Sequence, residues 1–415
     1  MGTGFAYRNG VLYCDEVELA EIAEKTGTPV YVYSGETILA KFQAYSQALD
    51  GVPHRVCYAV KANGNLSILR LLAQAGAGFD IVSGGELFRV RKAGGAAQSV
   101  LFSGVGKTRA EIEYALEEGI GGFNCESEAE IMLIDSLARR LGLKPSIAVR
   151  VNPDVDAATH PYISTGLREH KFGIDIAVVE EVYERAARLE NLDVDGVACH
   201  IGSQLLDAAP LVEACEKLVA LVHRLRAKGI AIRHLDIGGG VGVPYKPADE
   251  RPDVPAYLEC IRKCVAGQDL TLSFEPGRSI VAEAGALLSR VLYRKSSTSR
   301  EFVVVDAAMN DLIRPVLYGA HHEILPLRQH AMGRVTADVV GPICESGDFL
   351  AKDREIANVM PGDLVGVMTA GAYGMVASSN YNARPRPAEV MVEGSAWRVI
   401  RERETFNDLI RGEGA

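Results

Sequence analysis

The sequence lacks what a protein needs to hold a membrane or a polyanion. Lys plus Arg number 44 against 54 Asp plus Glu, a formal net charge of −10, so no basic excess is present to bind nucleic acid or an anionic bilayer. No apolar run approaches the roughly 18 residues that cross a bilayer, and the opening MGTGFAYRNG lacks the charged and then apolar layout of a signal peptide. We therefore expect a cytoplasmic protein that binds neither nucleic acid nor membrane.

Cysteine and histidine are few and scattered. The closest two of the eight cysteines, Cys260 and Cys264, have helical i,i+4 spacing, so no C-x-x-C knuckle or disulfide framework is visible. The adjacent His321 and His322 belong to no H-E-x-x-H or similar spacing. The sequence predicts no metal site and mostly ordinary buried thiols.

The sequence does have length and a regular alternation. Its 415 residues, 48% of them apolar, predict a globular protein of two or three domains at roughly 100–200 residues each. From residue 55 on, short β-branched runs alternate with segments of helical period. The eight runs are 55–61, 78–83, 99–103, 121–124, 146–152, 194–200, 232–237 and 271–275. Eight strand-helix units favour a closed (β/α)8 barrel over an open doubly wound sheet, which more often has fewer strands.

The pattern changes on either side of this barrel. Beyond residue 280, alternating segments separated by Gly and Pro turns are typical of a mostly β domain; they lie at 301–306, 334–340, 364–368 and 389–393. Strand-like pieces at 11–13 and 29–33 precede a helix that Ser34 caps. We expect an N-terminal segment, 1–35, to join a C-terminal β domain, 281–415, with the barrel at 36–280.

The polar residues that close each run are the candidates for a site, because active sites of such barrels lie at the carboxyl ends of the strands. They are Lys61, Asp80, Ser83, Ser103, Asn124, Arg150, Asn152, His200, Asp236, Gly238, Gly239, Gly240 and Glu275. A packed barrel has little reason to gather a Lys, an Arg, a His and a Glu at one rim unless they serve a site. The alternative is that charged strand ends simply meet solvent at little cost.

Lys61, in YAVKAN, and Glu275, in EPGR, end the first and eighth runs, which become neighbours when a barrel closes. Burial would lower the pKa of the Lys61 amine and let it form a Schiff base. A buried Glu275 could hold the protonated ring nitrogen of pyridoxal phosphate, which withdraws electrons from a carbanion. Taken singly, each has a simpler interpretation: a solvated lysine, and an ion pair between Glu275 and Arg278.

Three further motifs carry weaker signals. GGGVG at 238–242 follows the seventh run, where many barrels bind phosphate on backbone N–H groups, but it fits neither G-x-G-x-x-G nor a Walker loop and can be a tight turn. HIGSQ supplies the ring of His200, which could stack on a cofactor, and the hydroxyl of Ser203, which could bind phosphate. Cys344, in CESGD, could donate a proton, since a thiol has a pKa of about 8.5, or could be incidental.

These motifs occur in the order of a known family. The chain resembles the bacterial diaminopimelate decarboxylases, pyridoxal-phosphate enzymes of the alanine-racemase-like barrel type, from about Gly27 to about Gly394. The matching segments are YAVKAN, FDIVSGGEL, FNCESEAE, RVNPDVDAATHPYISTGLREHKFGI, HIGSQ, DIGGGVG, EPGR, the region around Arg314 and Tyr318, CESGD and GAYGMVASSNYNARPRPAEV. No functional motif of the family is altered.

The resemblance implies a role for each matched residue. Lys61 would be the Schiff-base lysine, His200 would stack on the pyridine ring, and Glu275 would bind the ring nitrogen. Cys344 would return a proton to the α-carbon. The other cofactor-binding residues would be Ser203, Gly238, Gly239, Gly240, Gly277, Arg278 and Tyr373, and those that hold substrate would be Arg278, Arg314, Tyr318, Glu345 and Tyr373.

The implied reaction is decarboxylation of meso-2,6-diaminopimelate to L-lysine and CO2, the last step of lysine biosynthesis, in a homodimer whose partner chain donates the Cys344 segment. The bidentate fork of Arg314, helped by Tyr318, suits the distal carboxylate, and Glu345 suits the distal ammonium. The nearest alternative is a decarboxylase of lysine, ornithine, arginine or carboxynorspermidine on the same fold, whose substrates mostly lack that combination. A racemase would need an acid-base residue on each face of the cofactor.

Overall fold

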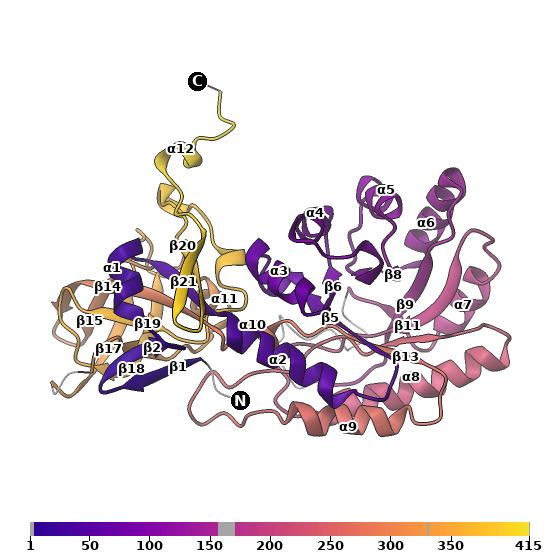
Figure 1. The fold of residues 1–415 in the computed structure, drawn as a ribbon, viewed down its shortest axis with the longest axis horizontal. Coiled ribbons are helices and arrows are strands. Elements are labelled where there is room, and N and C mark those ends of the chain that lie inside the picture. The colour runs from indigo at the N-terminus through magenta and orange to yellow at the C-terminus, as the bar shows by residue number, and fades with distance from the viewer. Residues whose placement is uncertain (1–3, 157–170, 330–331, 415) are drawn as a thin grey trace. The chain divides into compact units, whose positions relative to one another are not determined.

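The computed structural model describes residues 4–156, 171–329 and 332–414 (Figure 1). Residues 157–170, inside the long motif that begins at Arg150, lie outside the described part. The chain divides into two compact units, which we call the barrel unit (41–243 and 250–277) and the β unit (1–40, 244–249 and 278–415). The domain boundaries that the sequence suggests, after residues 35 and 280, stay a prediction.

The barrel unit contains a closed ring of parallel strands. Its members are β5 (His54–Ala59), β6 (Gly78–Ile81), β7 (Val100–Phe102), β8 (Gly122–Cys125), β9 (Ser146–Asn152), β11 (Asp193–Ala198), β12 (His234–Asp236) and β13 (Thr271–Phe274). Each strand pairs in parallel with the next, and β13 pairs with β5, which closes the ring. A short strand, β10 (Ile174–Asp175), pairs with β9. Each of the eight runs overlaps one of these eight strands, so the (β/α)8 prediction is confirmed.

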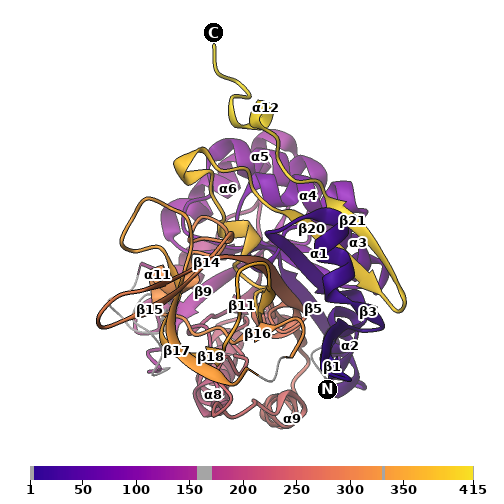
Figure 2. The ribbon, with the colours of Figure 1, turned by 90° about the vertical axis from the view of Figure 1, so that its left-hand side faces the viewer.

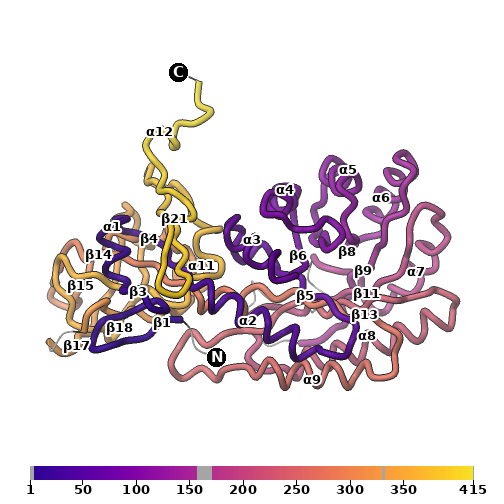
Figure 3. The backbone as a smooth tube through the Cα atoms, in the orientation of Figure 1, coloured from indigo at the N-terminus to yellow at the C-terminus, as the bar shows by residue number. Residues whose placement is uncertain are grey.

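Helices alternate with these strands, and the trace in Figure 3 follows the alternation. They are α3 (Leu66–Gln74), α4 (Gly84–Ala93), α5 (Arg109–Glu118), α6 (Glu128–Leu141), α7 (Val179–Ala186), α8 (Ala209–Ala227) and α9 (Val254–Cys264). Local sequence fixes where three of them begin. Ser83, Thr108 and Ser127 each accept a hydrogen bond from the amide of a glutamate three residues on, which satisfies a free N–H of the first turn.

The β unit is built on one long strand, β14 (Gly285–Ser296), which pairs with three others. The sheet order is β18 (Phe349–Ala357), β17 (Arg334–Val340), β15 (Glu301–Val305), β14, β4 (Val30–Ser34), β20 (Ala388–Glu393) and β21 (Ala396–Arg401). β19 (Leu364–Val367) pairs with β14 and with β16 (Ile324–Pro326). Strand β4 lies between β14 and β20, so this sheet combines both ends of the chain (Figure 2).

Smaller elements complete the β unit. A separate three-stranded sheet holds β1 (Phe5–Arg8), β2 (Val11–Cys14) and β3 (Val17–Glu18), so the piece at 11–13 does not extend the main sheet. The helices are α1 (Leu19–Thr26), α10 (Arg278–Val281), α11 (Arg314–Tyr318) and α12 (Phe406–Leu409), with 3-10 turns η3 (Met375–Ala377) and η4 (Tyr381–Ala383). Helix α2 (Gly35–Ala48) begins in this unit, where the Ser34 hydroxyl caps it by accepting from Thr37 N over 3.0 Å.

Within the described residues, none of the helices is both long enough and apolar enough to cross a membrane. The barrel unit also contains the 3-10 turns η1 (Val60–Ala62) and η2 (Ala97–Ser99). Turn η1 matters for the site, because it follows β5 directly and carries Lys61.

Candidate active site

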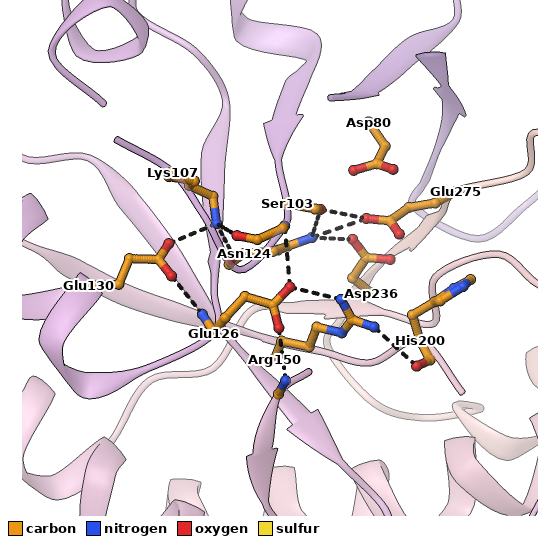
Figure 4. Close-up of polar contacts among 12 residues, drawn as sticks. Asp80, Ser103, Lys107, Asn124, Glu126, Glu130, Arg150, His200, Asp236 and Glu275 are labelled. Carbon is orange, nitrogen blue, oxygen red and sulfur yellow. Dashed lines mark hydrogen bonds and ion pairs between the residues drawn. The ribbon is translucent and has the colours of Figure 1, made fainter. Parts of the chain in front are cut away.

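Carboxyl groups gather at the carboxyl ends of the barrel strands. Asp236 ends β12, Glu275 directly follows β13, and both are buried (Figure 4). The amide Nδ2 of Asn124, on β8, lies 3.1 Å from Oδ2 of Asp236 and 3.1 Å from Oε1 of Glu275. Ser103, just after β7, donates to the same oxygen of Glu275 over 3.3 Å. The ends of four strands therefore contribute side chains to one buried cluster that is connected by hydrogen bonds.

Burial decides the protonation of this group. Desolvation raises the pKa of Glu275 well above its ordinary value, and the nearby charges of Asp236 and Asp80 add to the effect, although Lys61 opposes it. Desolvation also raises the pKa of Asp236, while hydrogen bonds that include the N–H of Gly238 lower it. Glu275 is consequently suited to keeping or sharing a proton.

Lys61 lies in turn η1, directly after β5, the strand that pairs with β13. Its Nζ is 2.7 Å from Oδ2 of Asp80, whose side chain is fully buried, whereas the Lys61 side chain is 34% exposed. The other carboxylate oxygen of Asp80 is buried without a hydrogen-bond partner in the described structure. Asp80 thus holds the amine at the mouth of the barrel, where a ligand can reach it.

The ring of His200, after β11, has a defined protonation state. Its Nδ1 is 3.2 Å from the amide N of Gly239, and because an amide N–H only donates, Nδ1 is the acceptor. Desolvation, with the positive charges of Arg150 and Lys61, lowers the pKa of His200 well below its ordinary value. The ring is neutral and carries its proton on Nε2.

The glycine run after β12 is packed between two other loops. A Cβ at Gly238 would lie 2.4 Å from the carbonyl O of Cys199, and one at Gly239 would lie 2.3 Å from that of Glu275. A Cβ at Gly240 would lie 2.7 Å from the carbonyl O of Gly202. Only glycine allows this approach, which locks the loops after β11, β12 and β13 together.

A second buried network continues outward from Asn124, and sequence reasoning named its Arg150 but missed Lys107, Glu126 and Glu130. Lys107 Nζ is 2.7 Å from Oε1 of Glu130 and donates over 2.8 Å to the carbonyl of Asn124. Arg150 Nη1 donates to Oε1 of Glu126 over 2.8 Å, and its other arm reaches the carbonyl of His200 at 3.3 Å. The FNCESEAE motif contains both glutamates, so the signal was in the sequence, but charged residues at a helix start also occur as ordinary caps.

The β unit contains its own cluster, built around Tyr245. Arg278 Nη1 donates to the hydroxyl of Tyr245 over 2.9 Å, and the guanidinium of Arg314 lies 4.5 Å from the centre of the same ring. The ring of Tyr373 lies 4.9 Å from the Arg278 guanidinium. Arg314 also contacts the ring of His322. Two buried cations set among neutral rings make an anion-binding arrangement. Tyr245 and His322 lie in no motif that sequence reasoning used.

The remaining candidates are more exposed. Cys344 is exposed, and its amide donates to Oδ1 of Asn382 over 2.9 Å. Glu345 is exposed and hydrogen-bonds to Tyr381, which raises the pKa of that phenol. Tyr318 is partly buried at the end of α11.

The predicted residues are divided between the two units, and two of the strand-end candidates have structural roles in a helix cap and a turn. The barrel unit holds Lys61, His200, Ser203, Gly238, Gly239, Gly240, Glu275 and Gly277, and the β unit holds Arg278, Arg314, Tyr318, Cys344, Glu345 and Tyr373. Of the strand-end candidates, Ser83 is the cap of α4, and Asn152 accepts from the amide of Asp154 over 3.1 Å, as in a turn.

Residues 35–282, which include the barrel strands together with Lys61 and Glu275, match the family model described as pyridoxal-dependent decarboxylase, pyridoxal binding domain. Among curated relatives, diaminopimelate decarboxylase of Pseudomonas aeruginosa is 55% identical over 99% of this chain and 98% of its own length. The chain belongs to the diaminopimelate decarboxylase family and is a carboxy-lyase that uses pyridoxal phosphate.

Solved structures of the family agree. The diaminopimelate decarboxylase of Helicobacter pylori complexed with L-lysine has a TM-score of 0.91 at 44% identity, over 94% of this chain and 98% of that one. The M. jannaschii enzyme has a TM-score of 0.95 at 38% identity, over 99% of this chain and 98% of that one.

Proposed function

We propose that this chain decarboxylates meso-2,6-diaminopimelate to L-lysine and CO2 with the residues assigned above. The observation that carries the assignment is the placement of Lys61 and Glu275 at the ends of the paired strands β5 and β13. Curated relatives at 46 to 55% identity are diaminopimelate decarboxylases, which favours this substrate over another basic amino acid.

The barrel residues fit pyridoxal phosphate by their chemistry. Lys61 has an amine that is held but reachable, Glu275 has a carboxyl that keeps a proton, and His200 has a flat neutral ring. When bound, the cofactor supplies an electron sink for the electron pair left by departing CO2. We assign its phosphate to Ser203, Gly277 and Arg278 and to the glycine run, and its ring nitrogen to Glu275.

Each barrel residue has a task that follows from its surroundings. Asp80 orients the Lys61 amine through the 2.7 Å contact between Nζ and its buried Oδ2. Glu275 can hold a proton on Oε2, because Asn124 and Ser103 both donate to its Oε1 and so fix the orientation of the carboxyl group. His200 cannot take a second proton easily, so it contributes a ring face and not an acid.

The β-unit residues recognise the far end of the substrate. Arg314 and Tyr318 bind the distal carboxylate, Glu345 binds the distal ammonium, and Arg278 and Tyr373 assist. Cys344 delivers a proton to the α-carbon after CO2 has left. An unfilled distal site would leave Arg314 without a counter-charge, which disfavours substrates that lack a carboxylate there.

We further place the enzyme in the cytoplasm as a homodimer in which the Cys344 segment serves the partner's site. The exposure of Cys344 and Glu345 supports the shared site, because exposed side chains can contact a second chain. Mixing a Lys61→Ala chain with a Cys344→Ala chain should restore part of the activity through heterodimers. Absence of restoration, with subunit exchange demonstrated by mass spectrometry, would count against a shared site.

The function itself is tested by CO2 release from the purified protein with pyridoxal phosphate. Meso-diaminopimelate, L-lysine, L-ornithine and L-arginine are compared in parallel, and L-lysine is identified by chromatography. Release from meso-diaminopimelate alone is the expected result. Release only from a substrate without the distal carboxylate would overturn the assignment of Arg314.

A further inference from the structure

His322 is fully buried between Arg314 and the backbone of Met368. It lies in the loop between α11 and β16. Its Nε2 is 2.9 Å from Nη1 of Arg314, and its Nδ1 is 2.9 Å from the carbonyl O of Met368. The ring of Tyr245 packs edge-on against it, with centroids 5.3 Å apart. The imidazole is therefore held on both nitrogens.

The two contacts define its protonation. A guanidinium N–H can only donate and a carbonyl can only accept, so Nε2 carries the lone pair and Nδ1 carries the proton. A second proton would point at Nη1 of Arg314. In agreement, burial and the charge of Arg314 lower the pKa of His322 to about 3. The contacts and the lowered pKa both indicate a neutral ring at pH 7.

A neutral acceptor is an unusual partner for a buried arginine, which more often bonds to a carboxylate. No Asp or Glu pairs with Arg314 in the part of the chain that the structure describes. The other groups that act on its guanidinium are Tyr245, whose ring centre is 4.5 Å away, Tyr373, and the like charge of Arg278. The charge of Arg314 is held in place without being neutralised.

We propose that His322 is a positioning residue that sets substrate specificity: it orients Arg314 through a neutral nitrogen, so that the full positive charge stays available to the carboxylate that the substrate keeps. The inference rests on the proposed function, in which Arg314 binds the distal carboxylate. A carboxylate at position 322 would compete with the substrate for the same cation.

Two substitutions at position 322 distinguish the orientation of Arg314 from the neutralisation of its charge. His322→Gln keeps a neutral acceptor, and His322→Glu introduces an anionic one. We expect His322→Glu to raise KM for meso-diaminopimelate at least about tenfold with kcat within about threefold, and His322→Gln to change either constant by less than about threefold. His223→Glu, on the exposed part of α8, is the control for an added negative charge and should leave both constants unchanged.

Binding gives a readout that does not depend on turnover. The holoenzyme variants are titrated by calorimetry with L-lysine, which has a carboxylate, and with cadaverine, which is the same diamine without it. His322→Glu should lose most of the preference for L-lysine, while its affinity for cadaverine stays close to that of the parent. An unchanged preference in a folded His322→Glu protein would overturn the proposal, and so would its loss in His322→Gln.

A spectroscopic test keeps the proposal falsifiable where His322→Glu does not fold. The ¹⁵N spectrum of histidine-labelled parent protein, with His322→Gln used for assignment, should show a neutral ring protonated on Nδ1 from pH 8 to pH 5. A ring protonated on Nε2 would refute the role of His322. Failure of the parent to form L-lysine from meso-diaminopimelate, with the spectrum as expected, would instead refute the proposed function.

Discussion

The amide of Gly239 donates to Nδ1 of His200 over 3.2 Å, and a backbone loop thereby selects the tautomer of a side chain on another strand. The same residue lies against the carbonyl of Glu275, so it touches both neighbours of the glycine run. The ring of His200 and the backbone of Glu275 are consequently both in contact with one residue that has no side chain.

Replacing Gly239 by alanine tests this packing. The new Cβ would lie 2.3 Å from the carbonyl O of Glu275, a distance that no relaxed structure keeps, so Gly239→Ala should lose about 1–3 kcal/mol of unfolding free energy or more. Gly106→Ala is the matched control, because nothing lies within 4 Å of its Cβ position. Urea unfolding measures the stability of both variants. Equal midpoints would show that the loop can shift to accommodate a Cβ at position 239.

Glu275→Gln should change the pH dependence of stability. The folded state raises the pKa of Glu275, so its ionisation is resisted. The contribution is complete below the ordinary pKa of a glutamate and is lost as pH rises through the raised value. We expect the cofactor-free Gln variant to gain stability relative to the parent as pH rises from 5 to 8, and its kcat to fall about 10²-fold or more. Parallel stability curves would contradict the assigned shift.

His322→Gln should change how the free energy of unfolding depends on pH below pH 7. Here the folded pKa, about 3, is below the ordinary value, so the stabilisation is complete above about pH 6.5 and is lost as pH falls toward 3. The loss amounts to at most about 1.4 kcal/mol per pH unit. The free energy of unfolding of the parent should therefore fall faster between pH 7 and pH 5 than that of the variant, and equal slopes would show that the ring takes a proton in the folded state.

Two glutamates on either side of Ser127 should respond differently to removal of charge. Glu126 pairs with Arg150 at 2.8 Å, with side chains only 3% and 10% exposed, so Glu126→Gln should cost about 3–5 kcal/mol. Glu128 pairs with Arg185 at 2.6 Å, but both side chains are close to half exposed, so Glu128→Gln should lower the free energy of unfolding far less than Glu126→Gln does. Chemical denaturation measures the free energy of unfolding of both variants. Similar losses in the two would show that the buried pair of Glu126 and Arg150 stabilises the fold no more than the exposed pair does.

The barrel could be read from the sequence because its strands are buried on both faces and appear as short apolar runs. The long strand β14 was not identified, since its GALLSRVLYRKS sequence passes from fully buried to exposed along its length and keeps no single period. Strand β18 was missed for a related reason: FLAKDREIA carries four charged residues, most of them facing solvent. Edge and half-exposed strands show a weaker pattern than core strands.

Site residues at the ends of the barrel strands could also be predicted from the sequence, whereas those in loops could not. Ser103, Asn124 and Asp236 could be named as strand-end residues before the fold was known, and they meet at Glu275. Tyr245 and His322 could not, because they come from loops whose positions depend on how distant segments pack. A lone histidine in a sequence carries no sign of which nitrogen will be bonded.

The middle position of β4 in its sheet affects how the protein is made. Tyr33, on this strand, donates its hydroxyl hydrogen to Glu389 over 2.8 Å, across 356 positions of the chain. A growing polypeptide exposes this segment almost at once, yet the strands on either side of it are synthesised much later, β20 nearly at the end. The barrel strands, all encoded between these points, can close while the ribosome is still working, and β4 can then pair with β14, but its other edge has no partner until β20 is synthesised near the end of translation.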